Sequence, residues 1–400
     1  MRTLSILIVA MFTFTATFAQ QALFGGQDII SPEIHANNTV TFRMMAPEAT
    51  KVEITGDFLP TQKRQTPMGE FDTPGIVELT KKENGIWEYT TPSPLDPELY
   101  SYSLIVNGVS IVDPNNPYMN RDIASVTSIF IVGGGKADLY KVNDVPHGSV
   151  TRRWYDSPAL GLTRRITIYT PPGYESGTER YPVFYLLHGA GGDEESWIAL
   201  GRSTQILDNL IAQGKAKPMI VVMTNGNAGQ KAAPGESDEG MYKPSFMGAT
   251  RMDGAFELAF PDILAFIESN YRTINTKAGR AIAGLSMGGF HSLHISKEYP
   301  DKFDYVGLFS SAIGVAQQGV TSPVYENLEA KLKAQFATPP KLYWIACGTT
   351  DFLYQANLDY CKLLTDNKYP YTYYESDGGH IWRNWRVYLT EFVPMLFKSL

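Results

Sequence analysis

The serine of one short glycine-flanked motif is the residue best suited to act as a nucleophile. In the motif GLSMG at residues 284–288, glycine on each side of Ser286 permits a turn so sharp that larger neighbours would clash. The small apolar residues 281–283 precede the motif as a short strand, and residues 289–295 continue without a helix breaker. A strand, a sharp turn carrying serine and a helix together form a nucleophile elbow. The sequence therefore predicts that the Ser286 hydroxyl attacks a carbonyl carbon.

A histidine and an acid must assist this serine, because a serine hydroxyl is a weak nucleophile without a base. Where the nucleophile stands on such an elbow, the chain order is serine, acid, histidine. His380 lies in a glycine-rich loop near the C-terminus, and Asp351 follows the apolar, strand-like residues 342–346. Asp377 is the alternative acid, but its place three residues before His380 suits a loop-shaping role better. We predict that Asp351 orients His380 and that His380 activates Ser286.

The reaction also needs backbone donors for the oxyanion that forms when the carbonyl is attacked. One donor is expected to be the N–H of Met287, the first residue after the nucleophile. The second is expected from the glycine-rich residues 188–192, with Ala190 as the first candidate and Gly189 as the next. His188 precedes the nucleophile in the chain, so we expect it to be structural.

The remaining histidines and the cysteines give no metal site. His291 and His294 form the one close histidine pair, but they fall in the helix behind the nucleophile and have no evident third ligand. The chain has only two cysteines, Cys347 and Cys361, so at most one disulfide can form, and a buried thiol is the better reading of Cys347. We expect neither a metal nor another cofactor.

Aromatic residues near these motifs are candidates for binding a substrate. Trp197 follows the expected oxyanion loop, and Trp382 follows His380. Tyr242 lies in residues 226–256, a long stretch with little periodicity that is either a lid or binding loop or a solvated insertion. Such rings can hold an aromatic or sugar group, although a tryptophan is as often part of the core.

The composition sets the broad class of protein. A chain of 400 residues with 44% hydrophobic and 19% charged residues is globular and long enough for two domains. The net charge of −7 disfavours nucleic acid and anionic membrane surfaces as partners. No stretch approaches the roughly 18 apolar residues of a membrane span.

The first residues have the pattern of a signal peptide. Arg2 provides the positive start, residues 4–14 are mostly apolar, and the small residue before a cleavage site is Ala19. The alternative is a short buried helix or strand. We expect residues 1–19 to be removed and the protein to be secreted or periplasmic.

Two differently patterned regions follow. Residues 20–133 contain short alternating segments separated by turn residues, which predict an all-β sandwich. Residues 134–148 are rich in glycine and polar residues and predict a linker. In residues 149–400, apolar strands alternate with helical patterns, which predicts a wound, mainly parallel α/β sheet.

With these motifs identified, the chain from about residue 147 onward resembles the bacterial feruloyl esterases and their esterase D and enterochelin esterase relatives. The matching segments, in order, are YTPPGY at 169–174, LLHG at 186–189, RAIAGLSMGG at 280–289, CGTTD at 347–351 and GH at 379–380. The resemblance implies an α/β-hydrolase fold, with Ser286, Asp351 and His380 as the triad, Met287 and Ala190 at the oxyanion hole, and no cofactor.

The N-terminal region is similar to the early-set, immunoglobulin-like modules that precede glycogen- and starch-acting enzymes. The likeness rests on Phe42, AP at 46–47, GIW at 85–87, NG at 107–108 and DP at 113–114. The combined resemblance implies an ester hydrolase for hydroxycinnamoyl esters of plant cell-wall xylan, with feruloylated xylan or xylo-oligosaccharide as substrate. The alternatives are an acetylxylan esterase, an enterochelin esterase, and a carbohydrate-binding protein with an inactive esterase domain.

Overall fold

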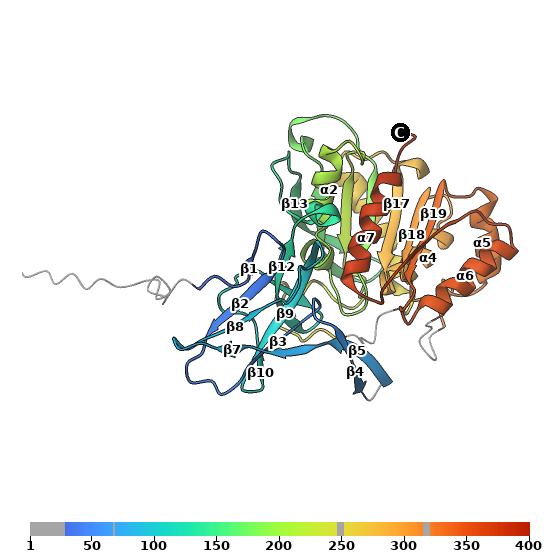
Figure 1. The fold of residues 1–400 in the computed structure, drawn as a ribbon. Helices are drawn as coiled ribbons and strands as arrows, with labels where there is room; N and C mark the ends of the chain where they lie inside the picture. Colours follow the sequence, from blue (N-terminus) through green and yellow to red (C-terminus); the bar gives the residue numbers. More distant parts are fainter. Residues whose placement is uncertain (1–28, 67–68, 246–251, 315–320) are drawn as a thin grey trace, which may run out of the picture.

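The computed structural model describes residues 29–66, 69–245, 252–314 and 321–400. Figure 1 shows an all-β N-terminal domain packed beside a larger C-terminal domain, in which helices cover both faces of a central sheet. This is the predicted fold class. The predicted signal peptide lies outside the described residues.

Two sheets of the N-terminal domain enclose one core. The first sheet has four strands in the order β1-β2-β8-β7, and the second has six, with β11-β12-β9-β3-β6 in order and β10 on β9. Their inward side chains, among them Phe42, Trp87, Tyr102 and Phe130, form one apolar cluster. The strands of both sheets are β1 (Glu33–Ile34), β2 (Val40–Met45), β3 (Val52–Gly56), β6 (Ile76–Glu78), β7 (Thr80–Lys81), β8 (Ile86–Thr90), β9 (Glu98–Val106), β10 (Val109–Ile111), β11 (Met119–Asp122) and β12 (Ser125–Val132). A separate hairpin pairs β4 (Thr61–Thr66) with β5 (Gly69–Pro74).

One turn of this domain has the backbone conformation that its residue types predict. Asn107 and Gly108 join β9 to β10 with φ of 49° and 87°, and Val106 pairs directly with Val109. Positive φ at both central residues is the requirement of a type I′ hairpin turn, and asparagine followed by glycine tolerates it best. The Asn107–Gly108 pair therefore marks where β9 ends and β10 begins.

An eight-stranded sheet organises the C-terminal domain. Its order is β13-β14-β16-β15-β17-β18-β19-β20; β13, β14 and β16 pair antiparallel, and the other pairs are parallel. The central strands are continuous apolar runs because both of their faces are covered. The strands are β13 (Ser149–Ser157), β14 (Leu162–Thr170), β15 (Val183–Leu187), β16 (Ile220–Thr224), β17 (Arg280–Leu285), β18 (Tyr305–Phe309), β19 (Leu342–Gly348) and β20 (Thr372–Ser376).

Each face of this sheet has its own core. Alternate strand residues pack with α2 and α7 on one face, and the residues between them pack with α3, α4, α5 and α6 on the other. Figure 1 shows α7 lying across the first of these faces. The α-helices are α1 (Ser196–Ala199), α2 (Ser203–Ala212), α3 (Ala255–Asn270), α4 (Met287–Glu298), α5 (Leu328–Ala337), α6 (Tyr354–Asp366) and α7 (Trp382–Phe392). The short 3-10 helices are η2 (Gly135–Tyr140), η3 (Tyr174–Ser176), η4 (Lys277–Gly279) and η5 (Val393–Met395).

The segment between the two domains is packed, which the prediction of a flexible linker did not anticipate. It contains η2, whose Tyr140 is fully buried in the core shared with α2 and α7. Leu99 and Ile129 of the N-terminal domain lie in that same core. Arg386 of α7, also buried, donates to the Glu98 carboxylate at 2.9 Å. The two domains therefore share apolar core and a buried ion pair.

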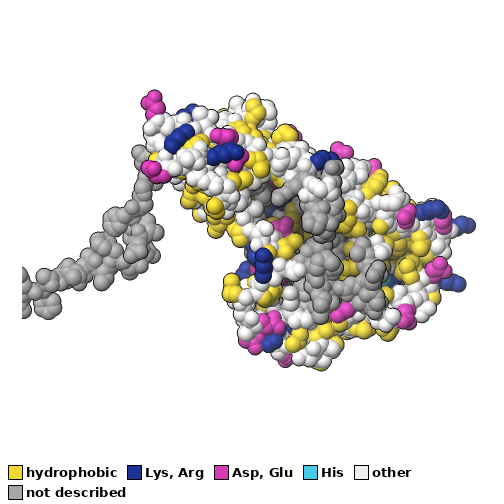
Figure 2. Space-filling model, turned by 90° about the horizontal axis from the view of Figure 1, so that it is seen from below, with side chains coloured by type: hydrophobic (Ala, Val, Ile, Leu, Met, Phe, Trp, Pro, Cys, Tyr) yellow, Lys and Arg dark blue, Asp and Glu magenta, His cyan; other side chains and the backbone are white. Residues whose placement is uncertain are grey.

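Both cysteines are free and buried, so the optional disulfide is not formed. Burial raises the pKa of the Cys347 thiol to about 12. Within the described ranges, no helix is long and apolar enough to cross a membrane. On the face drawn in Figure 2, acidic and basic side chains are interspersed rather than gathered into a patch of one sign.

Candidate active site

Ser286 stands on a strained turn between β17 and α4. Its φ of 52° and ψ of −114° are a conformation that a residue with a side chain rarely adopts. The turn is fixed from both sides, because Ser286 N–H donates to Phe309 O at 2.8 Å and Ser286 O accepts from Phe290 and Ala312 N–H, both at 3.0 Å. This is the strand, sharp turn and helix predicted from the motif.

Glycine is required on both sides of this turn. A Cβ at Gly284 would lie 2.5 Å from the Gly288 carbonyl carbon, and a Cβ at Gly288 would lie 2.4 Å from Leu187 O. Both contacts are with backbone, which cannot move aside as a side chain can. The two glycines therefore let β17, α4 and the end of β15 approach closely enough to form the elbow.

Asp351 and His380 meet at the carboxyl edge of the sheet. His380 Nδ1 lies 2.9 Å from Asp351 Oδ2 and 3.1 Å from Oδ1. Asp351 follows β19 and His380 follows β20, so two neighbouring parallel strands deliver the pair to one edge. With Nδ1–H donating to the carboxylate, Nε2 is the nitrogen left to accept a proton.

The surroundings hold both members of this pair in place. Asp351 Oδ1 also accepts from Leu353 N–H at 2.8 Å, and the Asp351 side chain is fully buried. The rings of Phe352 and Trp385 lie 4.6 Å and 4.9 Å from the His380 ring. These contacts fix the orientation of the Asp351 carboxylate and of the His380 ring.

Asp377 has a different environment. Its backbone O accepts from Asn384 Nδ2 at 3.0 Å, and the same amide donates to Gly379 O at 3.0 Å. Asn384 thereby fixes the loop that carries His380. Asp377 belongs to the shape of this loop, while Asp351 is the carboxylate bonded to the imidazole.

The expected oxyanion loop adjoins the nucleophile. A Cβ at Gly189 would lie 3.3 Å from the Ser286 Cβ. Ala190 packs in one apolar cluster with Met287, the first residue of α4, whose first N–H groups have no partner within the helix. The structure thus places Gly189 next to Ser286 and packs Ala190 in one cluster with Met287.

His188 supports this loop from behind. Its Nε2 accepts from Gly226 N–H at 2.8 Å, so Nδ1 carries the proton and donates to Gly189 O at 2.7 Å. Burial lowers the pKa of His188 to about 4. The neutral ring is a structural link between the ends of β15 and β16, as its position in the chain predicted.

An apolar cluster adjoins the nucleophile, because two of its members, Phe290 and Ala312, donate their N–H groups to Ser286 O. Ala190 and Tyr325 pack at its border. Its buried members are Met252, Met287, Phe290, Ala312 and Leu353. Side chains from the oxyanion loop, from α4 and from the loops after β18 and β19 therefore pack together in one buried apolar cluster next to the elbow.

Trp197 is buried, which agrees with the alternative reading of this tryptophan as part of the core. Its side chain is 1% exposed, and its Nε1–H donates to Leu187 O at 2.9 Å. It packs edge to face against Trp382 and Phe309. Trp197 therefore anchors the oxyanion loop to the core, a role that its spacing alone did not reveal.

The other two predicted binding residues remain partly accessible. Trp382 begins α7, stacks edge to face on Trp385 and hydrogen bonds to the Asp122 carboxylate of the N-terminal domain. The Tyr242 hydroxyl donates to Ala232 O at 3.0 Å, which holds it over the loop after β16. Substrate binding by Trp382 and Tyr242 stays a prediction.

The sequence reasoning missed how closely the N-terminal domain approaches this site. Ile123, in the turn between β11 and β12, has φ of 52°, unusual for a β-branched residue. A Cβ at Gly191 would lie 2.9 Å from Ile123 Cγ1. Arg121 of β11 pairs with the buried Asp193, which follows the oxyanion loop. The alternating pattern of short strands predicts the strands themselves but not their contacts with distant segments of the chain.

A second polar cluster lies behind the nucleophile. His291 and Glu257 are both fully buried, with Nδ1 and Oε1 2.9 Å apart, and the Tyr325 hydroxyl donates to the same oxygen at 3.0 Å. His294 packs against the rings of Phe290 and Tyr325. Both histidines are thus packing residues, as predicted. Within the described residues, no group of three His, Cys, Asp or Glu side chains could hold a metal ion.

A strained serine on an elbow and a buried aspartate–histidine pair, all at the carboxyl edge of one wound sheet, define a serine hydrolase of the α/β-hydrolase fold. The family described as "Putative esterase" matches residues 157–396, more than half of the chain. The protein therefore belongs to this esterase family and is a serine esterase. Residues 30–118 match carbohydrate-binding module 48, the isoamylase N-terminal domain.

Curated relatives share this domain over part of their own length. An endo-1,4-beta-xylanase/feruloyl esterase of Xylanibacter ruminicola is 31% identical over 70% of this chain and 36% of its own. An esterase of Mycobacterium tuberculosis is 32% identical over 52% of this chain and 41% of its own. The chain thus spans well under half the length of either relative.

Solved structures agree with the fold. A ferulic acid esterase from Anaeromyces mucronatus is 25% identical, with a TM-score of 0.54 over 65% of this chain and 94% of its own. The enterobactin esterase of Shigella flexneri covers 90% of this chain and 93% of its own with a TM-score of 0.60, at 17% identity. The second likeness extends over both domains and concerns the fold alone.

Proposed function

We propose that this protein is a secreted feruloyl esterase that releases ferulate or related hydroxycinnamates from plant cell-wall xylan. The observation that carries the proposal is the apolar cluster of Met252, Met287, Phe290 and Leu353 beside the nucleophile. An aromatic acyl group buries its ring against such side chains, whereas an acetyl group has no ring to bury.

The names of the relatives support the same substrate class. One curated relative is an endo-1,4-beta-xylanase/feruloyl esterase, and two solved structures with at least 25% identity are ferulic acid esterases. The module at residues 30–118 is of a carbohydrate-binding type. An esterase joined to such a module suits an ester carried by a polysaccharide.

The proposed reaction assigns one role to each polar group, and the Asp351–His380 hydrogen bonds support it. Ser286 Oγ attacks the ester carbonyl while His380 Nε2 takes its proton, and Asp351 stabilises the imidazolium through Nδ1–H. The N–H groups of Met287 and Ala190, with Gly189 as the alternative, receive the oxyanion. His380 then protonates the departing sugar oxygen, and water attacks the acyl-enzyme with His380 again as base.

Secretion is part of the proposal and rests on the first residues. Arg2, the apolar residues 4–14 and a small residue at Ala19 form the signal-peptide pattern. Comparing the N-terminus of protein recovered outside the cytoplasm with the translated sequence tests it. Recovery of the full-length chain from the cytoplasm alone would contradict it.

The substrate assignment is tested with three esters and the purified mature protein. Release of ferulate, acetate and enterobactin fragments is measured under the same conditions. Burying an aromatic ring contributes a few kcal/mol at about 25 cal/mol per Å², so methyl ferulate should exceed an aliphatic methyl ester in kcat/KM by roughly ten- to a hundredfold. Equal or lower efficiency on methyl ferulate would leave only the esterase class and favour the acetylxylan or enterochelin alternative.

A further inference from the structure

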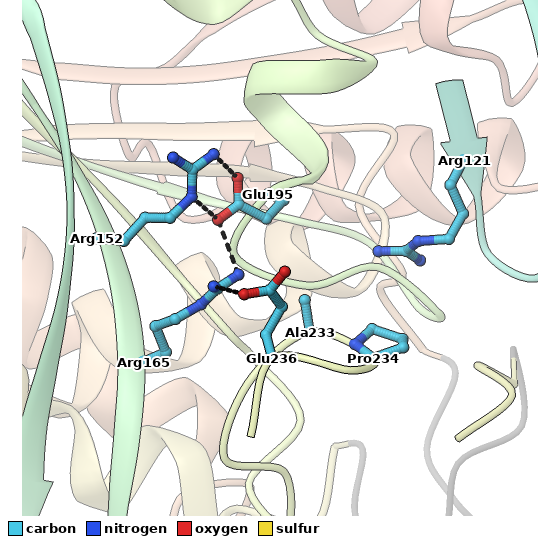
Figure 3. A pocket seen from close by; sticks show the side chains of 7 residues that line it. All are labelled: Arg121, Arg152, Arg165, Glu195, Ala233, Pro234 and Glu236. Atoms are coloured by element: carbon cyan, nitrogen blue, oxygen red, sulfur yellow. Dashed lines mark hydrogen bonds and ion pairs between the residues drawn. The ribbon is translucent and has the colours of Figure 1, made fainter. Parts of the chain in front are cut away.

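Two adjoining cavities form a polar groove along the β13–β14 edge of the large sheet. The first, about 450 Å³, combines side chains of β13 and β14 with Arg121 of the N-terminal domain. Figure 3 shows Arg121 facing it across from the other lining residues, which are Arg152, Arg165, Glu195, Ala233, Pro234 and Glu236. The second, about 380 Å³, is lined by Trp154, Gly161, Leu162, Thr163, Lys231 and Asp238.

Strand register places the two cavities on one face of the sheet. Arg152 and Trp154 are two residues apart on β13, so their side chains point the same way. Trp154 pairs directly with Arg165 of β14, and Arg165 N–H donates to Lys231 O at 2.7 Å. One cavity therefore continues into the other across the Trp154–Arg165 pair.

One end of the groove lies next to the segment that follows the oxyanion loop. The residue after Arg165, Ile166, pairs with Thr224 at the carboxyl end of β16, the edge at which the triad lies. Asp193, which holds Arg121, directly follows the oxyanion loop. A chain leaving the ester oxygen at Ser286 would thus reach Arg121 first and Trp154 farther out.

Every cation of the groove contacts a carboxylate, and the four cations face five carboxylates in all. Arg152 Nε lies 2.7 Å from Glu195 Oε1, and Lys231 Nζ lies 2.8 Å from Asp238 Oδ1. Arg165 contacts Glu194, Glu195 and Glu236, and Arg121 contacts Asp193. With each cation already paired, the groove offers an anion little net attraction. It offers a hydroxyl group both donors and acceptors within a short span.

Trp154 adds an apolar platform to this polar lining. Its side chain is 46% exposed, although burial on the sheet would be expected for so large an apolar residue. Sugar rings have apolar C–H faces and hydroxyl edges, so they pair naturally with an exposed indole flanked by paired charges.

We propose that this groove binds the uncharged saccharide chain whose ester the enzyme cleaves. The proposal rests on the proposed function for its substrate class, a xylo-oligosaccharide. Arg121 of the N-terminal domain lines the groove, so both domains contact the saccharide. The groove acts as a specificity site on the alcohol side of the ester, separate from the apolar acyl side.

Binding without chemistry tests the groove directly. In full-length Ser286→Ala protein, xylohexaose binding is measured by titration calorimetry, with a galacturonate hexamer as the anionic comparison. We expect saturable xylohexaose binding, at least tenfold weaker binding of the anion, and a Kd raised about tenfold by Trp154→Ala. The matched control is Arg153→Ala, because Arg153 is the next residue on β13 and packs on the opposite face, over Phe266. An unchanged Kd in folded Trp154→Ala protein, or tighter binding of the galacturonate hexamer, would overturn the proposal.

Kinetics separate this proposal from the acyl assignment. Trp154→Ala and Arg152→Ala should each lower the ratio of kcat/KM on a feruloylated xylo-oligosaccharide to kcat/KM on methyl ferulate by about tenfold, and Arg153→Ala should preserve it. If Trp154-dependent xylohexaose binding is present but ferulate is not released, the feruloyl assignment fails and the groove stands. If ferulate is released and the ratio is unchanged in both groove variants, the groove fails and the esterase assignment stands.

Discussion

At the scale of single residues, the role of His380 depends on which carboxylate accepts its Nδ1–H. Chain order favoured Asp351, and a nearby Asp377 offered an alternative three residues from the histidine. The structure brings Asp351 to within 2.9 Å of the imidazole and gives Asp377 a backbone contact with Asn384. Substitution of Asp351 and substitution of Asp377 are therefore expected to lower kcat by different amounts.

Replacing each acid by its amide tests this difference. Asp351→Asn should lower kcat by roughly 10²- to 10⁴-fold, because an amide does not hold the imidazolium or fix the tautomer as a carboxylate does. Asp377→Asn should lower kcat less than tenfold, because the backbone contact of Asp377 is retained. The measurement is kcat on a p-nitrophenyl ester, with circular dichroism to check folding. A larger loss in the Asp377 variant would mean that the acid is misassigned.

His188 gives a prediction on pH and stability. Its pKa is about 4 in the folded protein, below the ordinary value of about 6.5 expected when unfolded. Between these values the unfolded chain binds more protons, so the free energy of unfolding should fall as pH drops from about 6.5 to 4. His188→Asn should reduce this slope by up to about 1.4 kcal/mol per pH unit. Denaturant unfolding at several pH values measures it, and equal slopes in both proteins would contradict the assignment.

At the scale of elements, the nucleophile depends on close approach of three backbones. The ends of β15 and β17 and the start of α4 meet where Gly284 and Gly288 leave no room for a side chain. The strain at Ser286 is sustained by this packing and by its backbone hydrogen bonds.

Gly288→Ala tests whether that approach is needed. The added Cβ would lie 2.4 Å from Leu187 O and 2.6 Å from His188 O, so the elbow must shift. We expect a loss of roughly 1–3 kcal/mol in unfolding free energy and a severe loss of kcat. Gly177→Ala is the control, because its Cβ would first meet the end of the Glu179 side chain, which can turn away. A Gly288 variant with full stability and activity would show that the elbow tolerates a side chain.

Most of these elements follow from local sequence patterns. The apolar run at 342–346 became most of β19, because a strand covered on both faces must be apolar throughout. The GLSMG motif likewise predicted the strand, the sharp turn at Ser286 and the helix that follows. The burial of Trp197 and the contact of Ile123 with the oxyanion loop were not predictable, because both depend on how distant segments pack.

At the scale of the whole molecule, the two domains are joined by more than a linker. Leu99 and Ile129 from the N-terminal domain share a core with Tyr140 and with α2 and α7. The buried Arg386–Glu98 pair crosses the same interface. This shared core argues that the two domains stabilise each other.

Removing the N-terminal domain should therefore destabilise what remains. A chain beginning at Gly148 loses Leu99, Ile129 and Tyr140 from the core and the partner of Arg386. At about 25 cal/mol per Å², the newly exposed apolar surface should lower Tm by on the order of 10 °C. Differential scanning calorimetry of both chains measures this change. An equal Tm would show that the domains are energetically independent.

Active-site labelling tests whether Ser286 is the nucleophile of this esterase. An organophosphonate ester that mimics the tetrahedral intermediate should inactivate ferulate release with one adduct per chain, on the peptide that contains Ser286. Ser286→Ala should take no label and should release ferulate on the order of 10⁴-fold more slowly or less, while remaining folded. A stoichiometric adduct on another residue, or a folded Ser286→Ala protein with more than about a hundredth of the wild-type rate, would contradict the account.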